Sequence, residues 1–208
     1  MRPIETDVSI RENNISFMYA TYNNDTDEIY GTCDSGIFIF NCRTREVSII
    51  DIFPENERDY TIMSISLWAG EFWLATSNGL VRFDPVTAER KIYKQADGLP
   101  SDIVYSVLGA GDELWLATHS GLCQFDYVNE KMTTYYREHG LSHNEFNRWS
   151  SCRLDNGYLL FGGINGVIGF HPREFSFPNK RLGHLNLLNF SKYDQKEDQL
   201  VAVVNNPY

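Results

Sequence analysis

Glu71-Phe-Trp-Leu-Ala-Thr-Ser-Asn-Gly-Leu-Val-Arg-Phe-Asp84 and Glu113-Leu-Trp-Leu-Ala-Thr-His-Ser-Gly-Leu-Cys-Gln-Phe-Asp126 are two copies of one segment, aligned without a gap. Weaker copies lie at residues 28–41 and 158–171. The aligned glycines, Gly36, Gly79, Gly121 and Gly166, follow one another at intervals of 43, 42 and 45 residues. A period in the low forties, built from short alternating runs, is typical of a β-propeller blade.

Each repeat predicts four antiparallel strands. In the third copy these are 103–108, 114–118, 122–126 and 131–136, and Gly121 supplies the tight turn between the second and third of them. Trp73 and Trp115 are expected to fill the space between neighbouring blades, where aromatic side chains contribute most to packing. The fold class is therefore all-β, with four four-stranded blades.

The repeats also predict the domain organisation. The four blades are expected at about 15–57, 58–101, 102–146 and 147–175, after a leftover strand of a preceding blade within residues 1–14. A closed four-bladed ring is one alternative, but the leftover strand favours part of a larger ring. Residues 176–208 are expected to be a linker and the first strands of an Ig-like β-sandwich, at 185–190 and 199–204, with a polar turn at 193–198. Packing of these two strands on the last blade is the alternative, because two strands alone are unstable.

Composition excludes several classes of partner. The 28 acidic residues outnumber the 18 basic ones, so a formal charge of −10 disfavours nucleic acid and direct contact with an anionic membrane surface. No apolar run is long enough to span a bilayer, and the first residues lack the apolar stretch of a signal peptide. Read as a whole protein, the chain would be cytoplasmic.

Metal and disulfide chemistry is not indicated. The four cysteines, Cys33, Cys42, Cys123 and Cys152, have no Cys-x-x-Cys spacing and are expected to be unpaired, with a bridge between Cys33 and Cys42 as the alternative. His139 and His143 are four residues apart, but Gly140 lies between them and no helical pattern surrounds them. We expect no metal and no cofactor.

The repeats resemble a known family. Asp97-Gly-Leu-Pro-Ser-Asp-Ile-Val-Tyr-Ser106, followed by residues 113–118 and 121–126, is similar to the two-component regulator propeller repeat. Residues 140–147, 160–166 and 170–172 resemble the last blade of such proteins, which precedes a small sandwich domain named for three tyrosines.

The resemblance implies a fragment of a periplasmic sensor region. In that family, hybrid two-component sensors of gut Bacteroidetes carry two propellers and the sandwich, then a membrane helix, a histidine kinase, a response regulator and a DNA-binding domain. They respond to products of glycan breakdown and control polysaccharide-utilisation genes. The chain would then be periplasmic, joined to the rest of the sensor in a homodimer, and would bind an oligosaccharide or another small ligand. The kinase residues are not in this sequence.

Blade topology predicts where a ligand would bind. The turn between the second and third strands lies on the same face as the connection to the next blade, so one face collects short polar side chains, an aromatic ring and an arginine. Amides and hydroxyls suit sugar hydroxyl groups, and an arginine suits a carboxylate or sulfate. Turn preference explains most of these residues equally well, whereas it does not explain an arginine followed by a tryptophan. The candidate ligand-binding residues are Asn78, Asp102, His119, Asn144, Arg148, Trp149 and Asn165.

Catalysis is not expected. Glycosidase chemistry needs two carboxylates at a set separation, and the predicted face offers Asp34 and Asp102 on different blades, with Glu145 uncertain. Gly162-Gly-Ile-Asn-Gly166 lies between two strands rather than before a helix, so it is not a phosphate loop. A propeller lyase or hydrolase and a protein-interaction scaffold are the alternatives to a sensor.

Overall fold

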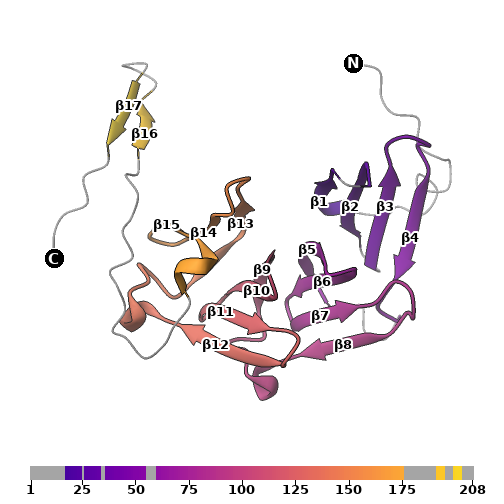
Figure 1. Ribbon diagram of the computed structural model, residues 1–208, viewed down its shortest axis with the longest axis horizontal. Coiled ribbons are helices and arrows are strands. Elements are labelled where there is room, and N and C mark those ends of the chain that lie inside the picture. The colour runs from indigo at the N-terminus through magenta and orange to yellow at the C-terminus, as the bar shows by residue number, and fades with distance from the viewer. Residues whose placement is uncertain are drawn as a thin grey trace.

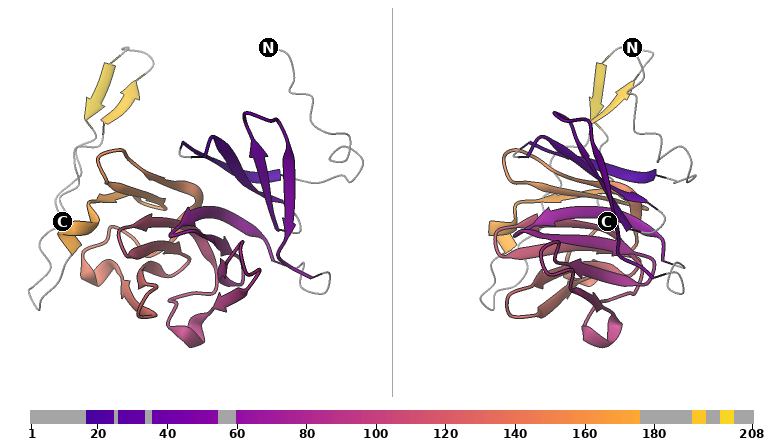
Figure 2. Two further views of the ribbon diagram at one scale, coloured as in Figure 1. Left: turned by 45° about the vertical axis from the view of Figure 1, so that its right-hand side comes forward. Right: turned by 90° about the vertical axis from the view of Figure 1, so that its right-hand side faces the viewer.

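Four β-sheets follow one another along the chain as the blades of a propeller (Figure 1). The computed structural model describes residues 17–24, 26–33, 36–54 and 60–175, and the two strands 191–194 and 199–202. In each blade the first strand lies on the inner side of the arc, and the later strands lie progressively farther out. Figure 2 shows blades 1 and 4 at the two ends of this arc. The predicted all-β propeller fold is confirmed.

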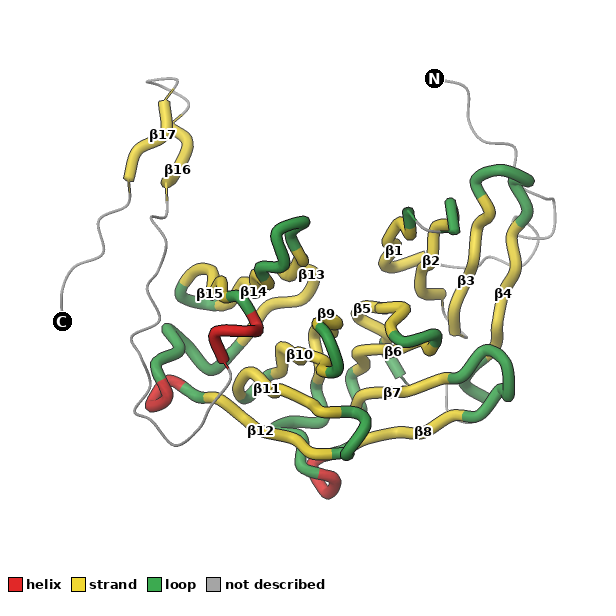
Figure 3. The backbone as a smooth tube through the Cα atoms, viewed as in Figure 1, coloured by secondary structure: helices red, strands yellow, loops and turns green. Residues whose placement is uncertain are grey.

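The strands match the predicted repeat closely. Their bounds are, for blade 1, β1 (Phe17–Asn23), β2 (Glu28–Cys33), β3 (Gly36–Asn41) and β4 (Val47–Asp51); for blade 2, β5 (Ile62–Trp68), β6 (Glu71–Thr76), β7 (Gly79–Phe83) and β8 (Arg90–Tyr93); for blade 3, β9 (Val104–Ala110), β10 (Glu113–Thr118), β11 (Gly121–Asp126) and β12 (Lys131–Tyr135); for blade 4, β13 (Phe146–Arg153), β14 (Leu159–Gly163) and β15 (Gly166–Phe170). Short 3-10 helices, η2 (Gln95–Asp97), η3 (Arg137–His139) and η4 (Pro172–Phe175), lie in the connections (Figure 3).

The core lies between blades. Each of three buried clusters joins one sheet to the next, and the same repeat positions supply them. Trp73 of blade 2 packs on Leu114 and Phe125 of blade 3, and Trp115 of blade 3 packs on Phe161 and Phe170 of blade 4 in the same way. Both tryptophans are fully buried. The prediction for Trp73 and Trp115 is confirmed, and loss of either ring would cost about 3–5 kcal/mol by the usual large-to-small scale.

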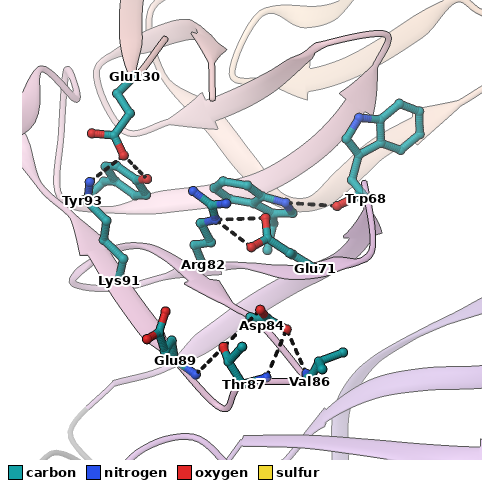
Figure 4. Close-up of polar contacts among 11 residues, drawn as sticks. Trp68, Glu71, Arg82, Asp84, Val86, Thr87, Glu89, Lys91, Tyr93 and Glu130 are labelled. Atoms are coloured by element: carbon teal, nitrogen blue, oxygen red, sulfur yellow. Dashed lines mark hydrogen bonds and ion pairs between the residues drawn. The ribbon is translucent and has the colours of Figure 1, made fainter. Parts of the chain in front are cut away.

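Polar contacts tie the outer strands together (Figure 4). The Arg82 Nε donates to both carboxylate oxygens of Glu71 across β6 and β7, at 2.9 and 2.8 Å. Lys91 and Tyr93 of blade 2 both donate to the Glu130 carboxylate of blade 3. The Arg82–Glu71 pair is partly buried and the Lys91–Glu130 pair is exposed. Exposed pairs of the second kind add little net free energy.

Blade 4 differs from the other three. Within the described residues its sheet has three strands, β13-β14-β15, and η4 follows β15 directly. Where the other first strands carry a one-residue bulge, β13 carries a longer one. Phe146 pairs with Gly163 and Ser151 with Phe161, so β13 advances five residues while β14 advances two. The repeat did not predict this bulge.

The C-terminal segment contains a hairpin of β16 (Ser191–Asp194) and β17 (Gln199–Ala202). The strand predicted at 199–204 is present as β17. The predicted polar turn at 193–198 is wrong at its start, because Tyr193 and Asp194 pair with Leu200 and Gln199 in the ladder. The strands predicted at 7–11 and 185–190 lie outside the described residues, and the β-sandwich stays a prediction.

Candidate functional site

The predicted ligand face is assembled by backbone contacts. We call it face A: it carries the turns at 77–78, 119–120 and 164–165 and the connections at 94–103 and 136–145. The Gly79 N–H donates to the Asp102 carbonyl, and the Gly121 N–H donates to the Asn144 carbonyl, both at 2.6 Å. Each turn therefore contacts the connection that leads into the next blade, as the topology predicted. Asp34 and Ser35, the corresponding turn of blade 1, lie outside the described residues.

Three of the predicted ligand residues are engaged by the protein itself. The Asp102 carboxylate accepts a hydrogen bond from the Gln95 N–H at 2.7 Å, and the Asn144 amide oxygen accepts one from the Arg137 N–H at 2.5 Å. These are equivalent positions before successive blades, so both side chains cap a 3-10 helix. The Asn78 amide oxygen accepts a hydrogen bond from Lys94 Nζ at 2.8 Å. Cap chemistry accounts for Asp102 and Asn144, and the bond to the Lys94 side chain accounts for Asn78.

A second group of face A residues forms a cluster between blades 3 and 4. The Tyr105 hydroxyl and His119 Nδ1 are 3.1 Å apart, and that nitrogen lies 3.7 Å from the Glu145 carboxylate. Burial, followed by the negative charge of Glu145, raises the pKa of Tyr105, while the positive charge of Arg148 acts in the opposite direction. Tyr105, His119, Glu145 and Arg148 therefore lie within electrostatic range of one another. The sequence singled out His119 and Arg148 of this group and missed Tyr105.

Trp149 follows Arg148 directly in the chain and has an unusual backbone conformation. Its φ is +56°, in the left-handed region that a bulky side chain rarely adopts, and its side chain is 57% exposed. It belongs to the long bulge of β13, together with Arg148. Strain of this kind costs about 1–3 kcal/mol and is concentrated at functional sites. The structure thus places Arg148 and Trp149 in the least regular part of the blades.

Asn165 is not joined to this cluster by any hydrogen bond or ion pair of the described residues. It is exposed in the turn between β14 and β15, and the nearest link is the neighbouring Ile164 N–H, which donates to the Glu145 carbonyl at 3.3 Å. Of the seven predicted residues, His119 and Arg148 both lie near Tyr105, and Trp149 follows Arg148 in the chain. Asp102 and Asn144 bond to the backbone, Asn78 bonds to the Lys94 side chain, and Asn165 is exposed.

His143 is buried beneath face A. Its side chain occupies the space that a second-strand threonine fills in blades 2 and 3, since blade 4 has Gly163 at that position. The Ser142 hydroxyl and His143 Nδ1 are 2.7 Å apart, and His143 Nε2 has no hydrogen-bond partner among the described residues. Burial lowers the pKa of His143. This imidazole is therefore neutral and fills the core rather than offering itself to a ligand.

Two cavities open toward the opposite face. We call this face B: it carries the turns at 69–70, 111–112 and 154–157. One cavity, of about 620 Å³, is lined by the inner strands of all four blades, and the other, of about 610 Å³, lies between blades 3 and 4. Arg153 and Asp155 line both. Sequence analysis assigned these residues to turns and predicted no ligand site among them, so the face B cavities were not predicted.

The described residues hold no group of three or more histidine, cysteine, aspartate or glutamate side chains that could bind a metal ion. Cys33, Cys42, Cys123 and Cys152 are free, so the alternative bridge between Cys33 and Cys42 is not formed. No helix within the described residues is both long and apolar enough to cross a bilayer.

Comparisons with known proteins point to one architecture. No protein-family model matches the chain, and no curated protein matches it. Among solved structures, the extracellular domain of the hybrid two-component system BT4673 from B. thetaiotaomicron matches 97% of this chain and 26% of its own, with a TM-score of 0.61 and 20% identity. The extracellular domain of BT3049 from the same species matches 98% of this chain and 34% of its own, with a TM-score of 0.55 and 16% identity.

Propellers of other kinds match as well. A chain of the mitotic checkpoint complex covers 78% of this chain and 48% of its own, with a TM-score of 0.56 and 15% identity. At such identities the likeness shows the fold, and a propeller alone does not decide a function. The chain spans about a quarter to a third of the two bacterial domains. It has the blade fold found in the extracellular domains of Bacteroides hybrid two-component systems.

Proposed function

We propose that this chain is a ligand-sensing, non-catalytic part of the periplasmic region of a hybrid two-component sensor that regulates polysaccharide use. The likeness to BT4673 and BT3049 over nearly the whole chain supports the class of protein. The observation that carries the ligand site is the irregular bulge of β13, which presents Arg148 and an exposed, strained Trp149 beside Tyr105, His119 and Glu145.

The cluster suits an oligosaccharide. A tryptophan ring can stack on the face of a sugar, while a phenol, an imidazole and a carboxylate pair with its hydroxyl groups. An arginine with a planar fork of donors adds recognition of a carboxylate or sulfate. The cluster lies between two blades, so a bound ligand would contact both of them.

The proposed signalling mechanism is a shift in the populations of two arrangements of the sensor. A ligand held at the blade 3–blade 4 junction favours the arrangement of the sensor that binds it best. In a homodimer of the parent sensor, that change in how the propeller contacts the following domain would bias the kinase across the membrane.

The test is Arg148→Ala in the parent sensor, with a reporter for the regulated genes and a panel of oligosaccharides. We expect at least a tenfold loss of ligand affinity and a matching shift in the dose response, since a hydrogen bond to a charged group contributes about 1.5–3 kcal/mol. Arg43→Ala is the control, because Arg43 is an exposed arginine in the turn between β3 and β4. Unchanged affinity and signalling in Arg148→Ala would overturn this site.

A further inference from the structure

One of the two face B cavities is lined by the first strands of the blades. It measures about 620 Å³, within the range of small-molecule sites. Each of the four blades contributes to its wall through its first strand. The polar and aromatic residues of that wall include Tyr19, Thr21, Tyr22, Ser66, Trp68, Ser151, Arg153 and Asp155.

Trp68 is placed in this wall by contacts with the next blade. Its indole N–H donates to the Gly111 carbonyl at 3.0 Å, and its ring lies so close to Gly109 that any Cβ at 109 would overlap it. The equivalent positions of blades 1 and 3 are Asn23 and Ala110. A tryptophan here is therefore not a requirement of the blade.

Arg153 of blade 4 completes the arrangement. Its guanidinium carbon lies 4.9 Å from the centre of the Trp68 ring, and one N–H donates to the Gly109 carbonyl at 3.4 Å. No carboxylate of the described residues lies within ion-pair distance of this guanidinium. The arginine is exposed and lines both face B cavities. An arginine has five N–H donors, so most of them remain for a ligand.

We propose that face B carries a second binding site, in which Trp68 and Arg153 recognise a saccharide that bears a carboxylate. The guanidinium would pair with the carboxylate, and the aromatic rings and the hydroxyl groups of Thr21, Ser66 and Ser151 would receive the sugar. Since Arg153 lines both cavities, the proposed ligand extends beyond one sugar, toward Asn156 and His171. This inference deepens the proposed sensing function but rests on different residues.

A purely structural role is the rival explanation. Trp68, Gly109 and Arg153 come from three successive blades, so their stack could serve only to hold the inner strands together. Such a role predicts that Arg153 supports folding and that no ligand affects Trp68. The two explanations differ in one observable: an acidic saccharide should shift the Trp68 indole signal if face B binds it, and should not if the stack is purely structural.

The test uses the chain's four tryptophans as reporters in a ¹H–¹⁵N spectrum. Trp68 reports face B, Trp149 reports face A, and the buried Trp73 and Trp115 serve as references. The probes are digalacturonate and cellobiouronate, each compared with its neutral methyl ester. We expect both or one of the acids to shift the Trp68 indole signal, with the ester binding at least tenfold more weakly.

Variants then separate binding from stability. Arg153→Gln should abolish the charge preference without changing the fold, and Arg153→Lys should retain part of it, because lysine keeps the charge but not the fork. Arg90→Gln is the matched control: Arg90 also lies over an aromatic ring, Phe53, and donates to a backbone carbonyl, that of Ile52, but lines neither cavity.

Three results would overturn the inference: no shift of Trp68 with either acid, equal affinity for acid and ester, or binding unchanged in Arg153→Gln. If Arg153→Gln only lowers the melting temperature, the stack is structural. A saccharide that shifts Trp149 alone would leave the proposed sensing function intact while removing this second site. Conversely, an acid that shifts Trp68 would support this site even if Arg148→Ala leaves signalling unchanged.

Discussion

Single residues explain both the regularity of the blades and where it ends. In blades 2 and 3, the hydroxyls of Thr76 and Thr118 each donate to the carbonyl of the glycine three residues later, at 2.7 Å. Each hydroxyl also accepts a backbone N–H at 3.1 Å. Blade 4 has Gly163 at this position, and His143 fills the vacated space. In blade 4 a buried imidazole thus takes the place of the hydrogen bond that the threonine hydroxyl makes within the turn in blades 2 and 3.

That replacement makes blade 4 sensitive to acid. Burial lowers the pKa of His143 below its ordinary value of 6.5, so the unfolded chain binds a proton at a higher pH than the folded chain. The contribution of neutral His143 to the stability of the fold is therefore fully present above pH 6.5, and it is lost as the pH falls toward the pKa of the folded state. We expect the melting temperature of the wild type to fall more steeply below pH 6.5 than that of His143→Gln, which has no titrating group there.

An NMR titration of the His143 ring protons checks the cause directly, since its midpoint should lie below 6.5. Equal pH slopes in the wild type and His143→Gln, measured by thermal melts between pH 7.5 and 5, would contradict this account.

At the scale of the elements, the turn between the third and fourth strands accepts either an aspartate or an asparagine at the same position. Asp84 and Asp126 each accept two backbone N–H bonds within their turns, and the Asp84 turn is visible in Figure 4. These bonds lower the pKa of both carboxyls, with the Val86 N–H the largest cause for Asp84 and the Asn129 side chain for Asp126. In blade 1 the same two bonds are accepted by the neutral Asn41.

Asp126→Asn should therefore keep the turn while removing its dependence on pH. A lowered folded pKa means that the aspartate's stabilisation is present above the ordinary value of 3.8 and is lost as the pH falls through the folded value. We expect melting curves of the variant and the wild type to differ little at pH 7. Between pH 4 and 2.5 the wild type should lose more stability than the variant. Asp112→Asn, an exposed aspartate in another turn, is the control, and a variant that unfolds earlier at every pH would show that the charge itself is required.

The elements also show how far sequence alone could reach. The period and the aligned glycines located the strands of blade 3 to within about two residues, because repeated blades bury equivalent positions and so repeat their side chains. The long bulge of β13 was not predictable in this way. Trp149 and Arg148 have no counterpart in the other copies, and only pairing in three dimensions reveals that β13 advances five residues against two.

The site was harder to predict than the fold for a related reason. Turn residues drew attention to face A, yet Asp102 and Asn144 accept hydrogen bonds from the backbone, and Asn78 accepts one from the Lys94 side chain. The face B residues Trp68 and Arg153 are far apart in sequence, and their stack depends on Gly109 of the blade between them. Departures from the repeat would have been the useful signal, since they mark positions that the fold itself does not explain.

At the scale of the whole molecule, the face of blade 1 that points away from blade 2 packs on no other blade of the described residues. Blades 2, 3 and 4 bury this face against the blade before them, through residues such as Phe83, Phe125 and Phe170. Blade 1 has Phe40 at the equivalent position, and Ile49 lies on the same face; both are at least partly exposed. The face therefore has the composition of an interface between blades, and no blade of the described residues covers it.

We expect this face to be covered by a further blade in a larger ring, and to drive self-association when the chain is studied alone, since uncovered sheet faces and edges pair readily. Ile49 is 39% exposed on this face, so Ile49→Lys should shift the chain toward monomer in sedimentation velocity experiments at several concentrations. Val86→Lys is the control: Val86 is 90% exposed in a turn of blade 2, and the same added charge there should leave the association unchanged. A chain that stays monomeric at all concentrations would show that blade 1 needs no partner, whereas equal effects of both lysines would attribute the change to net charge rather than to this face.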